Sequence, residues 1–161
     1  MRVYQLDDLP VHILMKYSDR LGFVSDTVKA HQDVIKTAGY VWFGKIGRRL
    51  GREPFKAINR QCAEGIPTYL FLVQKAPGGY SLARGVIKEI ATSPPAKCYP
   101  EYYSEHKLHT VMRVWVKLVK LEKIKDANAE LQRLYRLGSS DQIMNALTFS
   151  MNPMFAVTRR P

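Results

Sequence analysis

The run from Thr68 to Ile90, TYLFLVQKAPGGYSLARGVIKEI, sets the strictest limit on the fold. Residues 68–74 are apolar at both alternating positions, which is typical of a central strand covered on both faces. The APGG tetrapeptide at 76–79 supplies a turn, and residues 80–90 return as the partner strand. The sequence therefore predicts a hairpin whose first strand lies inside a sheet.

A third strand is predicted at residues 111–121, VMRVWVKLVKL, where side chains alternate between two faces. The alternation indicates one apolar face and one face of mixed character that a helix could cover. The first face carries Met112, Val114, Val116 and Leu118, and the second carries Arg113, Trp115 and Lys117.

The remaining pattern indicates an α+β domain. Capping residues open the segment 25–38, and Gly39 ends it, as expected of a helix. Residues 1–24 show no clear period, and the proline-rich segment 92–107 is predicted to be irregular. We expect one domain over residues 1–161, built on a mixed or antiparallel sheet. Helices are predicted at 25–38, 52–65, 127–137 and 139–147, and further strands at 40–46 and 154–158.

Positive charge is the first indication of function. The chain holds 25 lysine and arginine residues against 14 acidic ones, a net charge of +11. Residues 1–35 contain four of the basic and five of the acidic residues, so the excess lies beyond them. Such a field attracts polyanions and speeds their capture, although a merely basic soluble protein is the simpler alternative.

The same composition argues against a membrane or secreted protein. No apolar run approaches the roughly 18 residues that a membrane span needs, and charge appears too early for a secretory signal. Cys62 and Cys98 lie far apart, which suggests free thiols in a reducing compartment. His106 and His109 do not complete a metal site with them. We therefore expect a soluble, cytoplasmic protein without cofactor or metal.

Motifs for catalysis are missing from the sequence. It contains no GxSxG, HExxH or P-loop pattern, and its acidic residues are mostly single and beside lysines. The sequence therefore favours a binding module over an enzyme. Any nuclease or NTPase activity would belong to a partner or to another part of a longer protein.

Aromatic residues interleaved with basic ones indicate nucleic-acid binding. In GYVWFGKIGRR, residues 39–49, Trp42 precedes a glycine-containing basic loop. Cations can neutralise phosphates while rings stack on unpaired bases, each stack contributing about 1–3 kcal/mol. The alternative for every ring is core packing, and we favour it for Trp115 taken alone.

The order of these elements resembles the EVE and YTH branch of the PUA-like superfamily. The matching elements over residues 25–121 are a helix, GYVWFGKIGR, a basic helix, the hairpin and KLHTVMRVWVKL. The C-terminal segment from LEKIKD onward is similar to the end of EVE domains. The resemblance implies a strongly curved mixed sheet, forming a partial barrel flanked by short helices. It also implies a pocket for one modified or flipped base of DNA or RNA.

The resemblance also suggests which residues form the site. Trp42 matches the first cage tryptophan by position, while the second tryptophan of YTH domains is missing, which favours the EVE-like branch. The expected pocket residues are Trp42, Tyr40, Tyr80, Ser81, Tyr99, Tyr102, Tyr103 and Trp115. The expected contacts to the nucleic-acid backbone are Lys45, Arg48, Arg49, Arg52, Lys56, Arg60, Arg84, Arg113 and Lys117.

These observations lead to a hypothesis about function. The chain is expected to read a modified, flipped-out base in DNA, as EVE-like domains do when they serve as specificity modules of modification-dependent restriction systems. A nuclease or motor subunit would then be its partner. An RNA-binding PUA-like module and a protein-interaction domain are the alternatives. Fold-level likeness does not decide among them.

Overall fold

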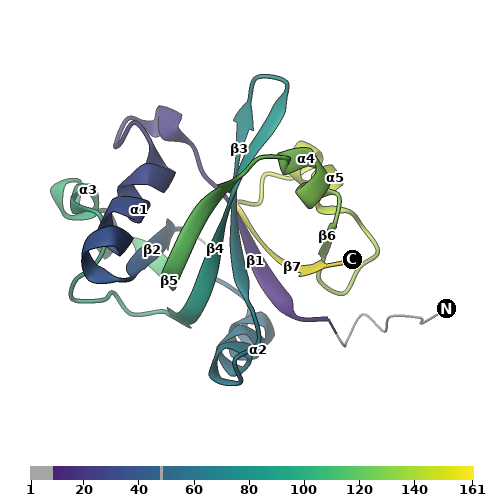
Figure 1. The fold of residues 1–161 in the computed structure, drawn as a ribbon, viewed down its shortest axis with the longest axis horizontal. Helices are drawn as coiled ribbons and strands as arrows, with labels where there is room; N and C mark the ends of the chain where they lie inside the picture. Colours follow the sequence, from purple (N-terminus) through teal and green to yellow (C-terminus); the bar gives the residue numbers. More distant parts are fainter. Residues whose placement is uncertain (1–8, 48) are drawn as a thin grey trace.

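The computed structural model describes residues 9–47 and 49–161, which form a mixed seven-stranded sheet with helices around it (Figure 1). The strand order is β2-β5-β4-β3-β1-β7-β6, and only the β1–β3 pair is parallel. The α+β class expected from the sequence is confirmed. The strands are β1 (Val11–Lys16), β2 (Val41–Ile46), β3 (Tyr69–Ala76), β4 (Gly79–Ala91), β5 (Met112–Ile124), β6 (Leu134–Arg136) and β7 (Met154–Arg159).

The helices are short and lie on both sides of the sheet. α1 and α3 lie near β2, α4 and α5 lie near β6, and α2 closes one end (Figure 1). In α1 the Asp26 carboxylate caps the first turn and Gly39 ends the helix at φ 85°, as the sequence predicts. The helices are α1 (Thr27–Ala38), α2 (Arg52–Ala63), α3 (Glu101–Glu105), α4 (Ala127–Leu131) and α5 (Ile143–Phe149), with 3₁₀ turns η2 (Asp19–Leu21) and η3 (Leu108–Thr110).

The sheet curls strongly. Three strands separate β2 from β1, which would place these two strands roughly 19 Å apart in a flat sheet. Yet Lys45 Nζ on β2 donates a hydrogen bond of 2.9 Å to the carbonyl oxygen of Lys16 on β1. Register shifts in the β2–β5 and β4–β5 pairs supply local bends. The expected partial barrel is therefore confirmed.

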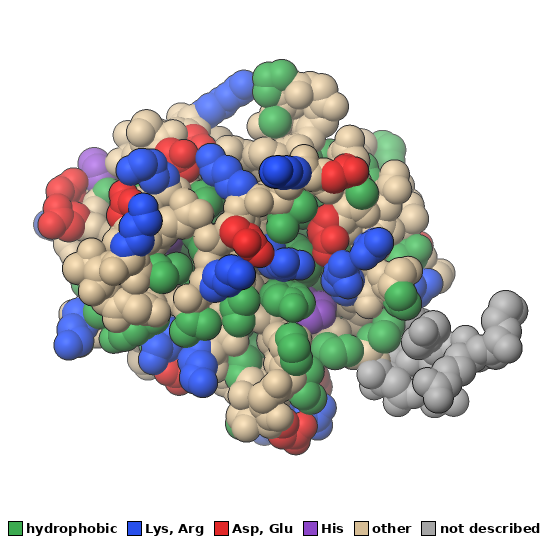
Figure 2. Space-filling model, viewed as in Figure 1, with side chains coloured by type: hydrophobic (Ala, Val, Ile, Leu, Met, Phe, Trp, Pro, Cys, Tyr) green, Lys and Arg blue, Asp and Glu red, His purple; other side chains and the backbone are tan. Residues whose placement is uncertain are grey.

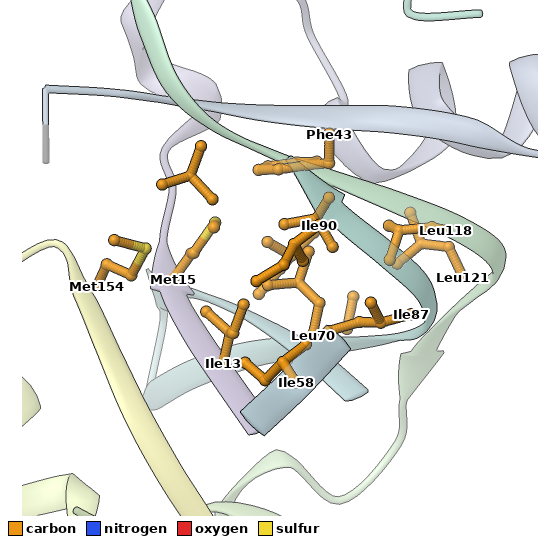
Figure 3. Packing of buried hydrophobic residues seen from close by; sticks show 14 of the residues in the cluster. Ile13, Met15, Phe43, Ile58, Leu70, Ile87, Ile90, Leu118, Leu121 and Met154 are labelled. Atoms are coloured by element: carbon orange, nitrogen blue, oxygen red, sulfur yellow. The ribbon is translucent and has the colours of Figure 1, made fainter. Parts of the chain in front are cut away.

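Two apolar clusters pack on opposite faces of the sheet. The larger one fills the inside of the curl, where Ile13, Phe43, Leu70 and Leu118 lie close together (Figure 3). The smaller one lies beneath α4 and α5. Along β3, Leu70 and Leu72 belong to the first cluster, whereas Phe71 and Val73 belong to the second. The prediction of a strand covered on both faces is confirmed.

Three sequence-based assignments are wrong. β1 lies within residues 1–24, where no element was predicted, because its run VHILM is buried on both faces and shows no period. The helix predicted over 127–137 ends at Leu131, and residues 134–136 instead pair with β7 as β6. Residues 92–107 are not wholly irregular, since α3 begins directly after Pro100.

Two further observations bear on the protein's class. Within the described residues, no helix is both long and apolar enough to cross a bilayer. Cys62 and Cys98 are free and half-buried, and burial raises the pKa of the Cys62 thiol.

Candidate functional site

The C-terminal ends of β1 and β2 meet at a cavity of about 300 Å³, here named the Phe43 cavity. Phe43 forms one wall from β2, and Tyr102 forms another from α3. Phe23 and Ile46, which are 39% and 44% exposed, bring the cavity to the surface. Its remaining lining residues are Lys16, Tyr17, Ser18, Val24, Thr27, Gly44, Lys45, Tyr103, Leu108 and Met112.

Two lysines, Lys16 and Lys45, line this largely apolar cavity. Lys45 Nζ donates to the Lys16 carbonyl oxygen, and Lys16 Nζ donates 2.7 Å to the Ser150 carbonyl oxygen. Within the described part of the chain, neither ammonium forms an ion pair. Burial lowers the pKa of Lys45, and burial followed by the charge of Lys75 lowers the pKa of Lys16. An anion bound within reach of both ammonium groups would relieve both penalties.

A buried hydrogen-bond chain fixes the inner wall of the cavity. The Gly44 N–H donates 3.1 Å to Tyr103 Oη, whose O–H in turn lies 2.6 Å from His31 Nε2. His31 Nδ1 lies 2.7 Å from the Thr27 carbonyl oxygen, which can only accept. The imidazole therefore carries its proton on Nδ1, and Nε2 accepts from Tyr103. Burial lowers the pKa of His31 to about 4 and raises that of Tyr103, so both groups are neutral.

Gly44 leaves room for a neighbouring side chain. A Cβ at this position would collide with the side chain of Met112, which belongs to the same apolar cluster as Tyr103. The glycine thus lets Met112 pack closely against β2 next to the hydrogen-bond chain.

Replacing Tyr103 by phenylalanine tests the hydrogen-bond chain. Tyr103→Phe would leave the buried Gly44 N–H and His31 Nε2 without their partner, so we expect a loss of about 2–4 kcal/mol in the free energy of unfolding, measured with urea. Tyr99→Phe is the matched control, because Tyr99 stacks on Tyr103 and its hydroxyl forms no hydrogen bond within the described part of the chain. The control should change stability by about 0.5 kcal/mol or less. Equal losses in the two variants would contradict the chain.

Trp42 lies outside the Phe43 cavity. Its ring points to the opposite face of β2 from Phe43, beside the Tyr103–Trp115 cluster, and it is half-buried. The Lys117 ammonium lies 6.0 Å from the Trp42 ring and 4.3 Å from the Tyr40 ring. The structure therefore places Trp42, Tyr40 and Lys117 on a part of the surface that is separate from the Phe43 cavity.

Trp115 is buried within the protein, and the half-buried Tyr99 packs against it. Trp115 is 0% exposed and contacts Tyr99 and Tyr103 in a small aromatic cluster. A base cannot reach this indole, so the expectation that Trp115 lines a base pocket is corrected to the core-packing alternative. The face of β5 that carries Trp115 is covered by the α3 segment, which lies in the region that the sequence predicts to be irregular.

The other expected pocket residues are divided among three cavities. Tyr102 and Tyr103 line the Phe43 cavity. Tyr80 lines a neighbouring cavity beyond the end of β1, and Ser81 lines a third, smaller one. The sequence thus identified residues near the site, but it did not separate the cavities.

The expected backbone contacts are also dispersed. Lys45 lines the Phe43 cavity, whereas Arg84 and Lys117 already pair with Glu122 and Glu89. On the face shown in Figure 2, lysine and arginine side chains are interspersed with acidic ones. Arg48 lies outside the described residues. The remaining expected backbone contacts are exposed elsewhere on the surface: Arg49, Arg52, Lys56, Arg60 and Arg113.

Sequence reasoning missed Lys16, Tyr17 and Phe23. Lys16 ends β1, and Tyr17 and Phe23 follow it in MKYSDRLGF, so recognising VHILM as a buried strand would have placed a basic and aromatic segment at its end. Ligands often bind where strands end, and the missed strand therefore hid this part of the site.

The structure is thus an α+β fold whose curled mixed sheet has an aromatic, lysine-lined cavity at its mouth. A family model described as Pua-like matches residues 13–146, and the chain therefore belongs to the Pua-like family. Pua-like domains generally bind nucleic acid, including RNA, and are typically binding modules rather than enzymes. Comparison with curated proteins and with solved structures gave no match.

Proposed function

We propose that this domain binds nucleic acid and receives one unpaired base in the Phe43 cavity. The observation that carries the proposal is the pair of lysines, Lys16 and Lys45, which line an apolar aromatic cavity and have no carboxylate partner among residues 9–47 and 49–161. An extruded nucleotide supplies both things that the cavity can bind, a flat ring and a phosphate.

The free-energy cost of extruding a base is comparable to the gain from stacking and from contacts to phosphate. Extruding a base from a duplex costs a few kcal/mol, and less when the base is already unpaired. One aromatic stack contributes about 1–3 kcal/mol, and charge-assisted contacts to phosphate add to it. Tyr102 is half-buried, so part of its ring faces the cavity. Burial raises the pKa of its hydroxyl to about 12, which keeps the proton available for a hydrogen bond to a base.

In its narrower form, the proposal is that the Phe43 cavity receives a modified base of DNA. Apolar walls from Phe43, Leu108 and Met112 favour a methyl substituent on the base. The resemblance to EVE-like domains supports a role as the specificity module of a modification-dependent restriction system, with a nuclease or motor partner. This part rests on the resemblance and on the apolar walls together.

An RNA-binding module is the second candidate, and membership in the Pua-like family favours it. A binding panel separates the candidates. It compares otherwise identical DNA duplexes that differ in one modified base with single-stranded RNA, at two salt concentrations. Tightest binding to one modified duplex supports the DNA proposal, and tightest binding to RNA supports the alternative. Weak binding that salt does not alter would indicate a protein-interaction domain.

Two substitutions locate the base. Tyr102→Ala should lower the affinity for the preferred substrate about tenfold while leaving salt-dependent background binding, because it removes the stacking surface. Trp42→Ala should lower the affinity in the same way only if the base stacks on Trp42, as the family resemblance implies. Fluorescence anisotropy measures both variants, after thermal unfolding has shown that they fold. Loss of preference in Trp42→Ala alone would contradict the Phe43 cavity as the base site.

A further inference from the structure

A second cavity of about 270 Å³, here named the Tyr80 cavity, adjoins the first. The two cavities share the three residues Lys16, Tyr17 and Ser18 in their linings, so this segment forms a ridge between them. The Tyr80 cavity is otherwise formed by η2, the β3–β4 hairpin and α5.

The Tyr80 cavity is cationic. Lys16, Arg20 and Lys75 all line it, and none of the three forms an ion pair within the part of the chain that the structure describes. The neighbouring carboxylate of Asp19 is engaged elsewhere, since it accepts hydrogen bonds from Thr27 and from the Gln74 side chain. The positive charge of Lys75 also disfavours the charged form of Lys16. This cluster of like charges would be stabilised by an anion.

Its walls also offer an aromatic surface. Tyr80 is half-buried at the start of β4, and Val73 and Leu147 add apolar lining to the same cavity. The Tyr80 cavity therefore repeats the combination found in the Phe43 cavity: a partly exposed ring beside lysines that have no acidic partner among the residues that the structure describes.

We propose that the Tyr80 cavity binds the nucleotide adjacent to the one in the Phe43 cavity, so that two consecutive bases are splayed across the Lys16–Ser18 ridge. Consecutive nucleotides are joined by one phosphodiester, and Lys16 is the cation that lines both cavities. Its ammonium donates one hydrogen bond to the Ser150 carbonyl oxygen, which leaves two N–H groups for the bridging phosphate. The inference rests on the proposed function and extends its ligand to a single-stranded or looped-out dinucleotide.

The test uses two trinucleotides with identical phosphates. One probe is a DNA trinucleotide with 5-methylcytosine between two thymidines, and the other has abasic deoxyriboses in place of both thymidines. NMR titration of the amide signals reports affinity and location together. We expect the first probe to bind about tenfold more tightly and to shift the signals of Lys75 and Tyr80 as well as those of Gly44 and Tyr102. The abasic probe should shift only the latter pair strongly.

Substitutions sharpen the test. Tyr80→Leu keeps the apolar volume but removes the aromatic face, and it should reduce the advantage of the first probe to about twofold while leaving the abasic probe unchanged. Lys36→Ala, at the far end of α1, is the control for a lost surface charge, and its probe ratio should equal that of the wild type.

The outcomes are distinguishable. Equal affinities of the two probes for the wild-type domain, or an unchanged ratio in Tyr80→Leu, would overturn the second subsite while the proposed function stands. Failure of both probes to shift Gly44 and Tyr102 would overturn base capture in the Phe43 cavity, and the inference with it.

Discussion

Replacing Lys16 and Lys45 together by methionine is expected to lower the affinity for nucleic acid about 100-fold. Each ammonium is fixed by a carbonyl oxygen and has donors left for a phosphate, and a charge-assisted hydrogen bond contributes about 1.5–3 kcal/mol. Methionine retains the apolar length of lysine, so the packing around the cavity is preserved. The salt dependence should also decrease, by about 0.9 in the logarithmic slope for each duplex phosphate contact that is lost.

A matched variant separates local contacts from net charge. Lys36→Met with Lys120→Met removes two exposed positive charges away from the cavity linings and should weaken binding only slightly. Affinities are measured by fluorescence anisotropy over a series of salt concentrations. Equal effects of the two double variants would mean that only overall charge matters, and the cavity would lose its role in the proposal.

Lowering the pH from about 7.5 to about 4 is expected to remove several kcal/mol from the free energy of unfolding. Burial lowers the pKa of His31 to about 4, and burial with the nearby positive charge of Arg159 lowers that of His12 to about 4. His12 Nδ1 accepts the Tyr69 N–H, which also requires a neutral ring nitrogen. In the unfolded chain both imidazoles titrate near pH 6.5.

The direction follows from proton linkage. Below about pH 6.5 the unfolded chain binds two protons that the folded chain refuses until about pH 4. Stability is therefore fully present above pH 6.5 and decreases as the pH falls, by up to about 1.4 kcal/mol per pH unit for each histidine. Over this interval the loss is on the order of 3 kcal/mol per histidine, and these two groups add no further loss below about pH 4.

Urea unfolding at a series of pH values checks this expectation. His31→Asn should remove about half of the pH dependence between pH 6.5 and pH 4, whereas His106→Asn, at an exposed position, should leave it intact. A wild-type stability that is flat over this interval, or one that His106→Asn flattens, would contradict the assignment of neutral buried histidines.

Elements with a local signal were predictable from the sequence. Helix α1 has its Asp26 cap and its Gly39 terminus within the segment itself, and β5 alternates residue by residue. By contrast, β6 exists because residues 134–136 pair with β7, more than twenty residues later. Helical spacing in that segment was real, but a strand partner outweighed it.

The candidate site was only partly predictable for the same reason. The sequence identified Lys45, Tyr102 and Tyr103, because basic and aromatic residues gather in those segments. It assigned the base to Trp42, since a strand pattern shows that neighbouring residues face opposite sides but not which side holds a cavity. Lys16 and Tyr17 belong to the site because the curl of the sheet brings the end of β1 close to β2.

By itself, the sequence determined the α+β class, the doubly covered β3 strand, the basic character and the aromatic–basic pairing near β2. Those properties depend on residues that are a few positions apart in the sequence. The geometry of the local helix or strand fixes the relative positions of such residues. Tertiary structure alone decided that β1 and β2, which three other strands separate in the sheet, bring Lys16 and Lys45 to a shared cavity. That meeting depends on accumulated sheet curvature and on long-range packing, which no local pattern encodes.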